Sequence, residues 1–293
     1  MLGVLLPLAT SLSWGVANVL IQRSGRAVGA PRALFWALLT GGALCASSSL
    51  VLESPSERVH ALMDLEVAGS LALASASGLM AYVGMFFAFE RAPLAIAVPI
   101  VSSWALVACL IAVVLLGQPA GGPGQLAGGA IVFAGVLAVS VGSGRGEGVA
   151  VNRGTTTVGP VFAALAASIG FGVMVSATGL VAARLGSLTT IALVYLSIVL
   201  LGLPIALLRG VSLAPPPRGR WPLVLATAVS EAAGFVFVSL APRYAPMTVV
   251  APLSSLAATF TVAYAWLVLH ERQPPHVVIG AILACVGVVV IAS

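Results

Sequence analysis

Long apolar stretches separated by short polar segments make up most of the chain. None of them alternates apolar with polar residues as a half-buried strand does, and each is much longer than an ordinary strand. A helix needs about 20 apolar residues to cross the hydrocarbon core of a membrane. The pattern therefore predicts an all-α polytopic membrane protein with ten transmembrane helices, over residues 2–21, 33–52, 67–89, 94–116, 126–141, 158–181, 187–208, 223–241, 248–269 and 277–292.

The two halves of the chain share an ordered set of residues, which indicates an internal duplication. The matched pairs are Ala92 with Ala245, Pro93 with Pro246, Pro99 with Pro252, Ser102 with Ser255, Gln118 with Glu271, and, after one dropped residue, Gly128 with Gly280 and Gly135 with Gly287. Because each copy has an odd number of spans, the second copy starts on the opposite side of the membrane and has the inverted orientation. We therefore expect two inverted five-helix repeats, residues 1–145 and 158–293, joined by a linker over 146–157. Secondary transporters commonly have such inverted repeats, with the binding site between them.

The composition excludes several classes of protein. Only 7% of the residues are charged and the mean hydropathy is +1.14, whereas soluble domains have about 25% charged residues. This excludes a soluble enzyme, a disordered chain and a nucleic-acid-binding protein. The net charge of +5 comes from arginines that mostly lie between apolar stretches, where they act as topology signals. The three cysteines form no CxxC pair, and no common catalytic or nucleotide-binding motif is present, so we expect no metal, no cofactor and no enzyme.

Glu231 is the strongest candidate for function, because it lies midway through the span over 223–241. A carboxylate at that depth costs a few kcal/mol and is typical of a substrate or ion pathway. It could bind and release a proton or hold a cationic group of a solute. The alternative is a protonated Glu that hydrogen-bonds between helices. Phe235 shares its helix face, and the matching helix offers Tyr82 as a second wall and Gly78, whose small size is expected to leave room for solute. For all three, ordinary helix packing is the alternative.

Further candidates lie in the first span and after two prolines. Trp14 and Asn18 are one helical turn apart on the first span. Proline interrupts the helical hydrogen bonds, and such broken helices often line a cavity. The hydroxyls that follow the prolines are therefore candidates for solute binding, or they bond back to their own helix. They are Ser102, Ser103, Ser255 and Thr259.

Charged residues at span ends are expected to be gate ion pairs or interface anchors, because side chains there can reach water. They are Glu90, Arg91, Arg243 and Glu271. The positions of the arginines also bear on orientation. By the positive-inside rule they place both termini outside the cell.

The segment from Tyr244 onward resembles the drug/metabolite transporter superfamily, specifically its EamA-type members with ten helices. The resemblance rests on Ala245-Pro246, on Pro-Leu-Ser-Ser-Leu over 252–256, on Glu271-Arg272, on the pair Gly280 and Gly287, and on Trp14-Gly15 in the first span. Gln118 departs from the family, which commonly has Glu there. The resemblance implies a multi-pass protein of the inner (cytoplasmic) membrane that exports or exchanges a small solute, amino-acid-like or drug-like. It also implies both termini in the cytoplasm.

The sequence as a whole predicts a secondary transporter that works by alternating access, an exporter coupled to protons or to exchange. Its partners would be a small-molecule solute, the lipid bilayer and protons, with no nucleic acid. An uncoupled facilitator or channel, and an integral membrane enzyme, are the alternatives. The sequence does not indicate an oligomeric state.

Overall fold

Helices form nearly all of the chain that the computed structural model describes, which is residues 1–53, 62–91, 97, 100–119, 121–142, 158–269 and 275–292, and there is no strand within these ranges. The first half contains α1 (Leu2–Val28), α2 (Ala30–Leu52), α4 (Leu65–Arg91), α6 (Trp104–Leu110), the π-helix η1 (Ile111–Leu115) and α7 (Pro123–Gly142). The second half contains α8 (Val158–Leu185), α9 (Ser187–Leu208), the short η2 (Arg218–Arg220), α10 (Trp221–Leu240), the short η3 (Ala241–Arg243), α11 (Met247–Ser254), α12 (Ala257–Leu269) and α13 (Pro275–Ala292).

Six of the described helices are long and apolar enough to cross a membrane, and they are α1, α2, α4, α8, α9 and α10. Shorter apolar helices cover Ile100–Leu115 and Met247–Thr261. Many large apolar side chains lie on the outside of the bundle, Leu200 and Val229 among them. Such a surface suits lipid rather than water. The expected polytopic, all-helical membrane protein is therefore confirmed.

Two of the expected spans are broken rather than continuous. The stretch over 248–269 divides into α11 and α12, with a turn at Ser255 and Leu256. The stretch over 94–116 has a turn at Ser103 before α6, and α6 runs on into η1. Pro252 has no backbone N–H to continue the helical bonding, which weakens the helix just before the first of these turns. The backbone is therefore irregular at matching places in the two halves.

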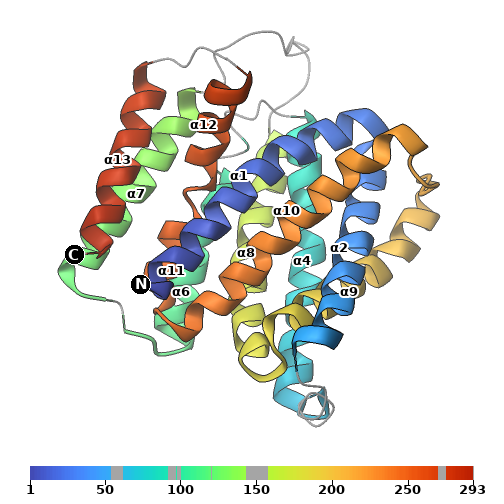
Figure 1. The fold of residues 1–293 in the computed structure, drawn as a ribbon, viewed down its shortest axis with the longest axis horizontal. Coiled ribbons are helices and arrows are strands. Elements are labelled where there is room, and N and C mark those ends of the chain that lie inside the picture. The colour runs from blue at the N-terminus through green and yellow to red at the C-terminus, as the bar shows by residue number, and fades with distance from the viewer. Residues whose placement is uncertain are drawn as a thin grey trace.

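The main helix pairs join one half of the chain to the other (Figure 1). α1 packs along α10, and α4 packs along α8. α2 packs along α9, and α7 packs along α13. The shorter elements follow the same rule, since α6 packs on α8 while α11 and α12 pack on α1. The interior of the bundle is thus an interface between the two halves.

The contact between α7 and α13 depends on glycines. A Cβ on Gly135 would come within 2.6 Å of the Gly280 carbonyl oxygen, and one on Gly287 within 2.7 Å of the Gly128 carbonyl oxygen. Small residues allow helix backbones to approach this closely in membranes. Because the order of the contacts is reversed along the two helices, α7 and α13 are antiparallel. Each glycine of one matched pair therefore lies against a glycine of the other pair, Gly135 against Gly280 and Gly287 against Gly128.

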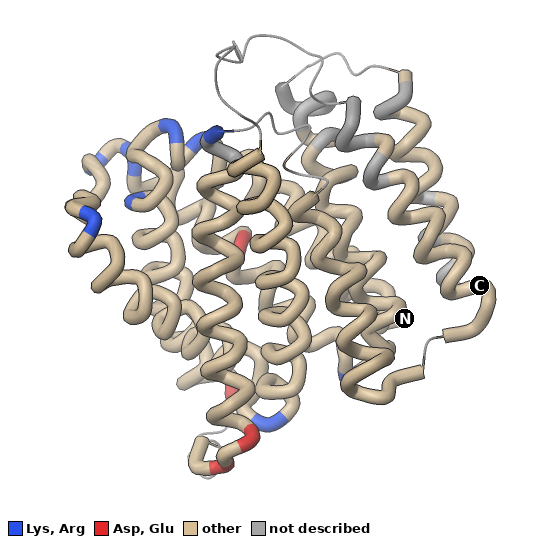
Figure 2. Tube along the Cα trace, turned by 180° about the vertical axis from the view of Figure 1, so that it is seen from behind, with Lys and Arg blue, Asp and Glu red and all other residues tan. Residues whose placement is uncertain are grey.

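Apart from Glu231 in the middle of α10, the described charged side chains lie at the two ends of the bundle (Figure 2). Seven of the described arginines lie at the end where α1 and α4 finish and α10 begins, namely Arg23, Arg26, Arg32, Arg91, Arg209, Arg218 and Arg220. The opposite end holds both chain termini, Arg184, Arg243 and the described acidic residues Glu53, Asp64 and Glu66.

Candidate functional site

Glu231 lies in the middle of α10 with only 8% of its surface exposed. Its Oε1 accepts a hydrogen bond of 2.9 Å from the Tyr82 hydroxyl of α4. The Tyr82 hydroxyl also lies 3.5 Å from that of Tyr195 of α9. Both tyrosines are almost completely buried. Three helices from the two halves thus meet at one carboxyl group deep in the protein.

A cavity of about 60 Å³ lies beside Glu231. Space of that size holds only a few water molecules. Its described lining comes from both halves, as Trp14, Asn18, Ile21, Met85, Val101, Ser102 and Trp104 from the first and Phe171, Val175, Glu231, Phe235, Ser255 and Ala257 from the second. We call this the central cavity. A larger solute enters it only if its walls move apart.

Four aromatic rings line the central cavity. The Trp14 ring packs edge-on against Phe235, with 4.8 Å between ring centroids, and against Trp104 at 5.6 Å. The Phe171 ring lies 6.4 Å from that of Phe235. These are favourable separations for aromatic pairs. The Trp14 indole N–H is buried against Gly234 of α10 and has no hydrogen-bond partner in the structure.

Six of the residues expected to bind solute come together in this lining, and they are Trp14, Asn18, Ser102, Ser255, Glu231 and Phe235. Asn18 Nδ2 donates to Thr261 Oγ1 at 3.2 Å. Ser255 Oγ donates to the Pro252 carbonyl at 2.7 Å, as expected for a hydroxyl that bonds its own helix.

The other four candidates are placed differently. Tyr82 lies behind Glu231 and does not line the cavity. The space expected beside Gly78 is filled, because a Cβ there would come within 2.7 Å of Ile198 and 2.9 Å of Met174; its small size serves the packing of α4 on α8 and α9. Ser103 Oγ lies 2.8 Å from Ser168 Oγ. Thr259 is not in the described lining, and its hydroxyl is buried without a partner.

A second cavity of about 340 Å³ lies at the end of the bundle that holds the termini. Along α8 the central cavity contacts Phe171 and Val175, and the second cavity contacts residues from Ser176 to Arg184. Between them α6 packs on α11, and Cys109 Sγ donates to the Met247 carbonyl at 3.7 Å. The two cavities thus follow one another along α8, separated by a closed stretch.

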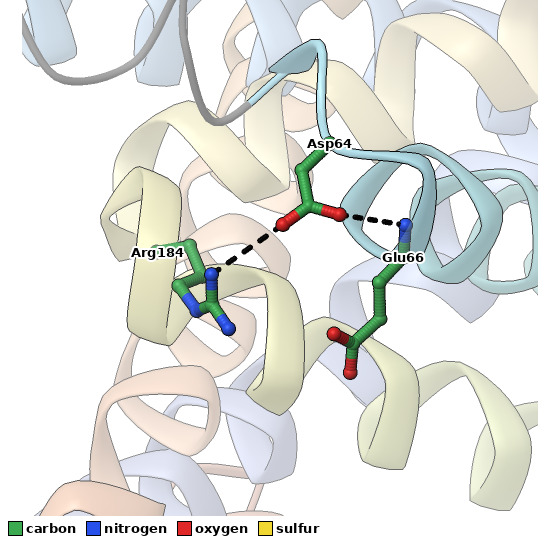
Figure 3. A network of polar contacts seen from close by, with 3 residues as sticks. All are labelled: Asp64, Glu66 and Arg184. Carbon is green, nitrogen blue, oxygen red and sulfur yellow. Dashed lines mark hydrogen bonds and ion pairs between the residues drawn. The ribbon is translucent and has the colours of Figure 1, made fainter.

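Polar contacts surround the second cavity. Arg243 lines it and donates to the Ala182 carbonyl at 2.7 Å, which ties η3 to the end of α8. Gln118 Oε1 accepts a bond of 3.0 Å from the backbone N–H of Met247, the first residue of α11. Arg184, also in its lining, forms an ion pair of 3.5 Å with Asp64, whose other oxygen accepts from the Glu66 backbone N–H (Figure 3).

The comparisons with known proteins agree with this geometry. The model of the EamA-like transporter family matches residues 1–141 and 159–293. This chain belongs to the EamA-like transporter family. A solved structure, titled only as the crystal structure of a protein, covers 98% of this chain and 96% of its own at 19% identity, with a TM-score of 0.78. That likeness concerns the fold. No curated protein matches the chain.

The predicted family is thereby confirmed, and with it the class of function. The EamA family consists of membrane transporters, so this EamA protein is an integral membrane transporter of small solutes rather than a member of an enzyme family. Within the part of the chain that the structure describes, no group of three or more His, Cys, Asp or Glu residues could hold a metal ion.

The expected gate residues of this EamA protein are only partly described. The Arg91 guanidinium lies 4.0 Å from the centroid of the Phe87 ring, on the same helix. Arg243 is exposed and holds η3, as above. The side chain of Glu90 and the whole of Glu271 lie outside the described residues.

Two polar residues of this EamA protein were not predicted from the sequence: Tyr195, near Glu231, and Glu53, beside the start of α9. Tyr195 stands beside Tyr82, and a phenol inside an otherwise apolar span was the available signal. Glu53, at the end of α2, accepts bonds from the backbone N–H groups of Leu188 and Thr189, at 2.9 and 3.0 Å, and from the Thr189 hydroxyl at 2.7 Å. It therefore caps the N-terminus of α9 from a distant part of the chain.

Proposed function

We propose that this protein is a secondary transporter that moves a small metabolite or drug-like solute across the cytoplasmic membrane by alternating access. The solute binds in the central cavity between the two halves, and Glu231 couples its movement to a proton or to exchange. Export is the direction we propose, on the resemblance to metabolite exporters.

The packing of the helices supports two inverted repeats. In chain order, α1, α2, α4 and α7 of the first half correspond to α8, α9, α10 and α13 of the second. The contact of α1 with α10 then corresponds to the contact of α8 with α4. In the pairs α2 with α9 and α7 with α13, each helix contacts its own counterpart. The breaks near Ser102 and Ser255 also correspond. The family matches two stretches, one in each half. Two equivalent halves can exchange conformations, which is the usual basis of alternating access in such transporters.

Glu231 is the observation that carries the proposal. One carboxyl oxygen is held by Tyr82, while the residue also lines a cavity between the halves. A purely structural acid would have no reason to face open space at a depth where a carboxylate is costly. The Tyr82 hydroxyl of α4 donates to this carboxyl group, and the Tyr195 hydroxyl of α9 stands next to that of Tyr82.

The two cavities support alternating access of this site. The closed stretch between them is formed by α6 and α11, the short helices that adjoin the two breaks. Short, broken helices can move without unfolding a whole span. Separation of α6 from α11 would join the central cavity to the second cavity and open the site toward the end that holds the termini.

Transport in liposomes tests the proposal. Purified protein is reconstituted and given a panel of labelled amino acids, amines and organic acids, with a pH gradient that nigericin can collapse. We expect at least one class to accumulate above its external concentration in liposomes that contain the protein and not in protein-free liposomes, because neutral amines and acids follow a pH gradient across lipid on their own. This protein-dependent accumulation should vanish with nigericin. Flux that only equilibrates, with or without the gradient, and that solute loaded inside the liposomes does not accelerate, would establish the uncoupled facilitator instead. No protein-dependent flux of any class would contradict transport.

A further inference from the structure

The charges in the described lining of the central cavity are of one sign only. Among its described lining residues, Glu231 is the one charged side chain, and there is no arginine or histidine. The chain as a whole contains no lysine. The remaining polar groups are the amide of Asn18 and the hydroxyls of Ser102 and Ser255, and four aromatic rings supply much of the rest. The part of the lining that the structure describes therefore offers one negative charge and no positive charge to a solute.

We propose, on the basis of the transport function proposed above, that the solute is a small organic cation that carries no carboxylate. A positively charged nitrogen offsets the charge of Glu231, which Tyr82 bonds at only one oxygen. Aromatic faces attract the same charge, and Trp14, Trp104 and Phe235 stand next to one another beside it.

The same lining disfavours the other charge types. The carboxylate of an amino acid would enter a buried site with no described cationic partner, and it would lie in the same small cavity as Glu231. An unpaired buried charge is strongly unfavourable. A hydroxyl is different, because the polar side chains of Asn18, Ser102 and Ser255 in the lining can hydrogen-bond to it.

A matched set of probes tests the charge requirement with the unaltered protein. Choline is a permanent cation with a hydroxyl, and betaine has the same head group and a carboxylate. Dimethylbutanol is the neutral carbon analogue of choline, and dimethylbutanoate is the corresponding anion. We expect choline to bind to protein in lipid nanodiscs, by titration calorimetry, at least about tenfold more tightly than each of the others. Only its trimethylammonium group combines the coulombic attraction of Glu231 with that of the aromatic faces and brings no second negative charge.

Two variants locate the binding. Glu231→Gln keeps the shape of the side chain but removes its charge, and the loss of that coulombic attraction should weaken choline binding about tenfold or more. Phe235→Leu should weaken it by about two- to thirtyfold through loss of the aromatic face. Asp64→Asn is the matched control, because this carboxylate pairs with Arg184 at the bundle end, and it should leave choline affinity unchanged.

Three outcomes would overturn the inference: equal or tighter binding of betaine or dimethylbutanoate, choline binding that Glu231→Gln does not change, or no binding of choline. None of these touches the transport proposal itself. If an amino acid or organic acid accumulates in the liposome panel while choline does not bind, the substrate class is wrong and transport stands. If no solute moves but choline binds as expected, transport is wrong and the cation site stands.

Discussion

The hydrogen bond between Tyr82 and Glu231 gives a quantitative prediction for Tyr82→Phe. The substitution removes one oxygen and leaves the ring in place against Phe171, 5.2 Å away between centroids. Both partners are buried, and Tyr82 is not in the lining of the central cavity. Leaving a buried polar group without its partner costs about 1–3 kcal/mol. We therefore expect Tyr82→Phe to lower the free energy of unfolding by that amount.

The assay is reversible unfolding in mixed micelles by titration with dodecyl sulfate, followed by tryptophan fluorescence. Tyr244→Phe is the matched control, because Tyr244 is 51% exposed, and such a change usually alters stability by less than about 0.5 kcal/mol. Glu231→Leu removes the acceptor and completes a double-mutant cycle. In the Glu231→Leu variant, Tyr82→Phe should leave the free energy of unfolding almost unchanged. The cycle then gives a coupling energy of about 1–3 kcal/mol between the two residues. If Tyr82→Phe lowers the free energy of unfolding equally in the unaltered protein and in the Glu231→Leu variant, the hydrogen bond between Tyr82 and Glu231 is refuted.

Three further predictions concern other parts of the molecule. Glu53→Ala removes the cap of α9 and should lower the free energy of unfolding by about 1–2 kcal/mol, whereas Glu66→Ala on an exposed carboxylate should change it little. Gly287→Leu should force α13 away from α7 and cost about 1–3 kcal/mol, while Gly69→Leu, with open space around it, should not. From the arginine distribution, reporters fused to either terminus should lie outside the cell; cytoplasmic reporters would instead support the orientation that the family resemblance implies.

Much of the local structure could be predicted from the sequence. Apolar stretches of membrane-spanning length predicted helices, because a chain in lipid must satisfy its backbone hydrogen bonds within itself. Helical spacing put Glu231 and Phe235 on one face, and both line the central cavity. Pro252 pointed to the broken span, and Ser255 at the break lies in the lining.

Long-range partners could not be predicted, because they depend on how the helices pack. Tyr82 is 149 residues from the carboxyl group that it bonds, and Glu53 is 135 residues from the first amide that it caps. The surroundings of Gly78 could not be predicted for the same reason. Its lack of a side chain is visible in the sequence, but only the packing of α4 on its neighbours shows that Ile198 and Met174 occupy the space.

The central claim, that Glu231 couples transport, is tested most directly by Glu231→Gln in the liposome assay with the same metabolite panel. The variant keeps the size of the side chain and can still accept the bond from Tyr82, so it should fold, which its elution profile and unfolding transition check. We predict that the unaltered protein and Asp64→Asn accumulate solute in response to the pH gradient, and that Glu231→Gln does not. Accumulation by Glu231→Gln with unchanged extent and unchanged pH dependence would contradict the account.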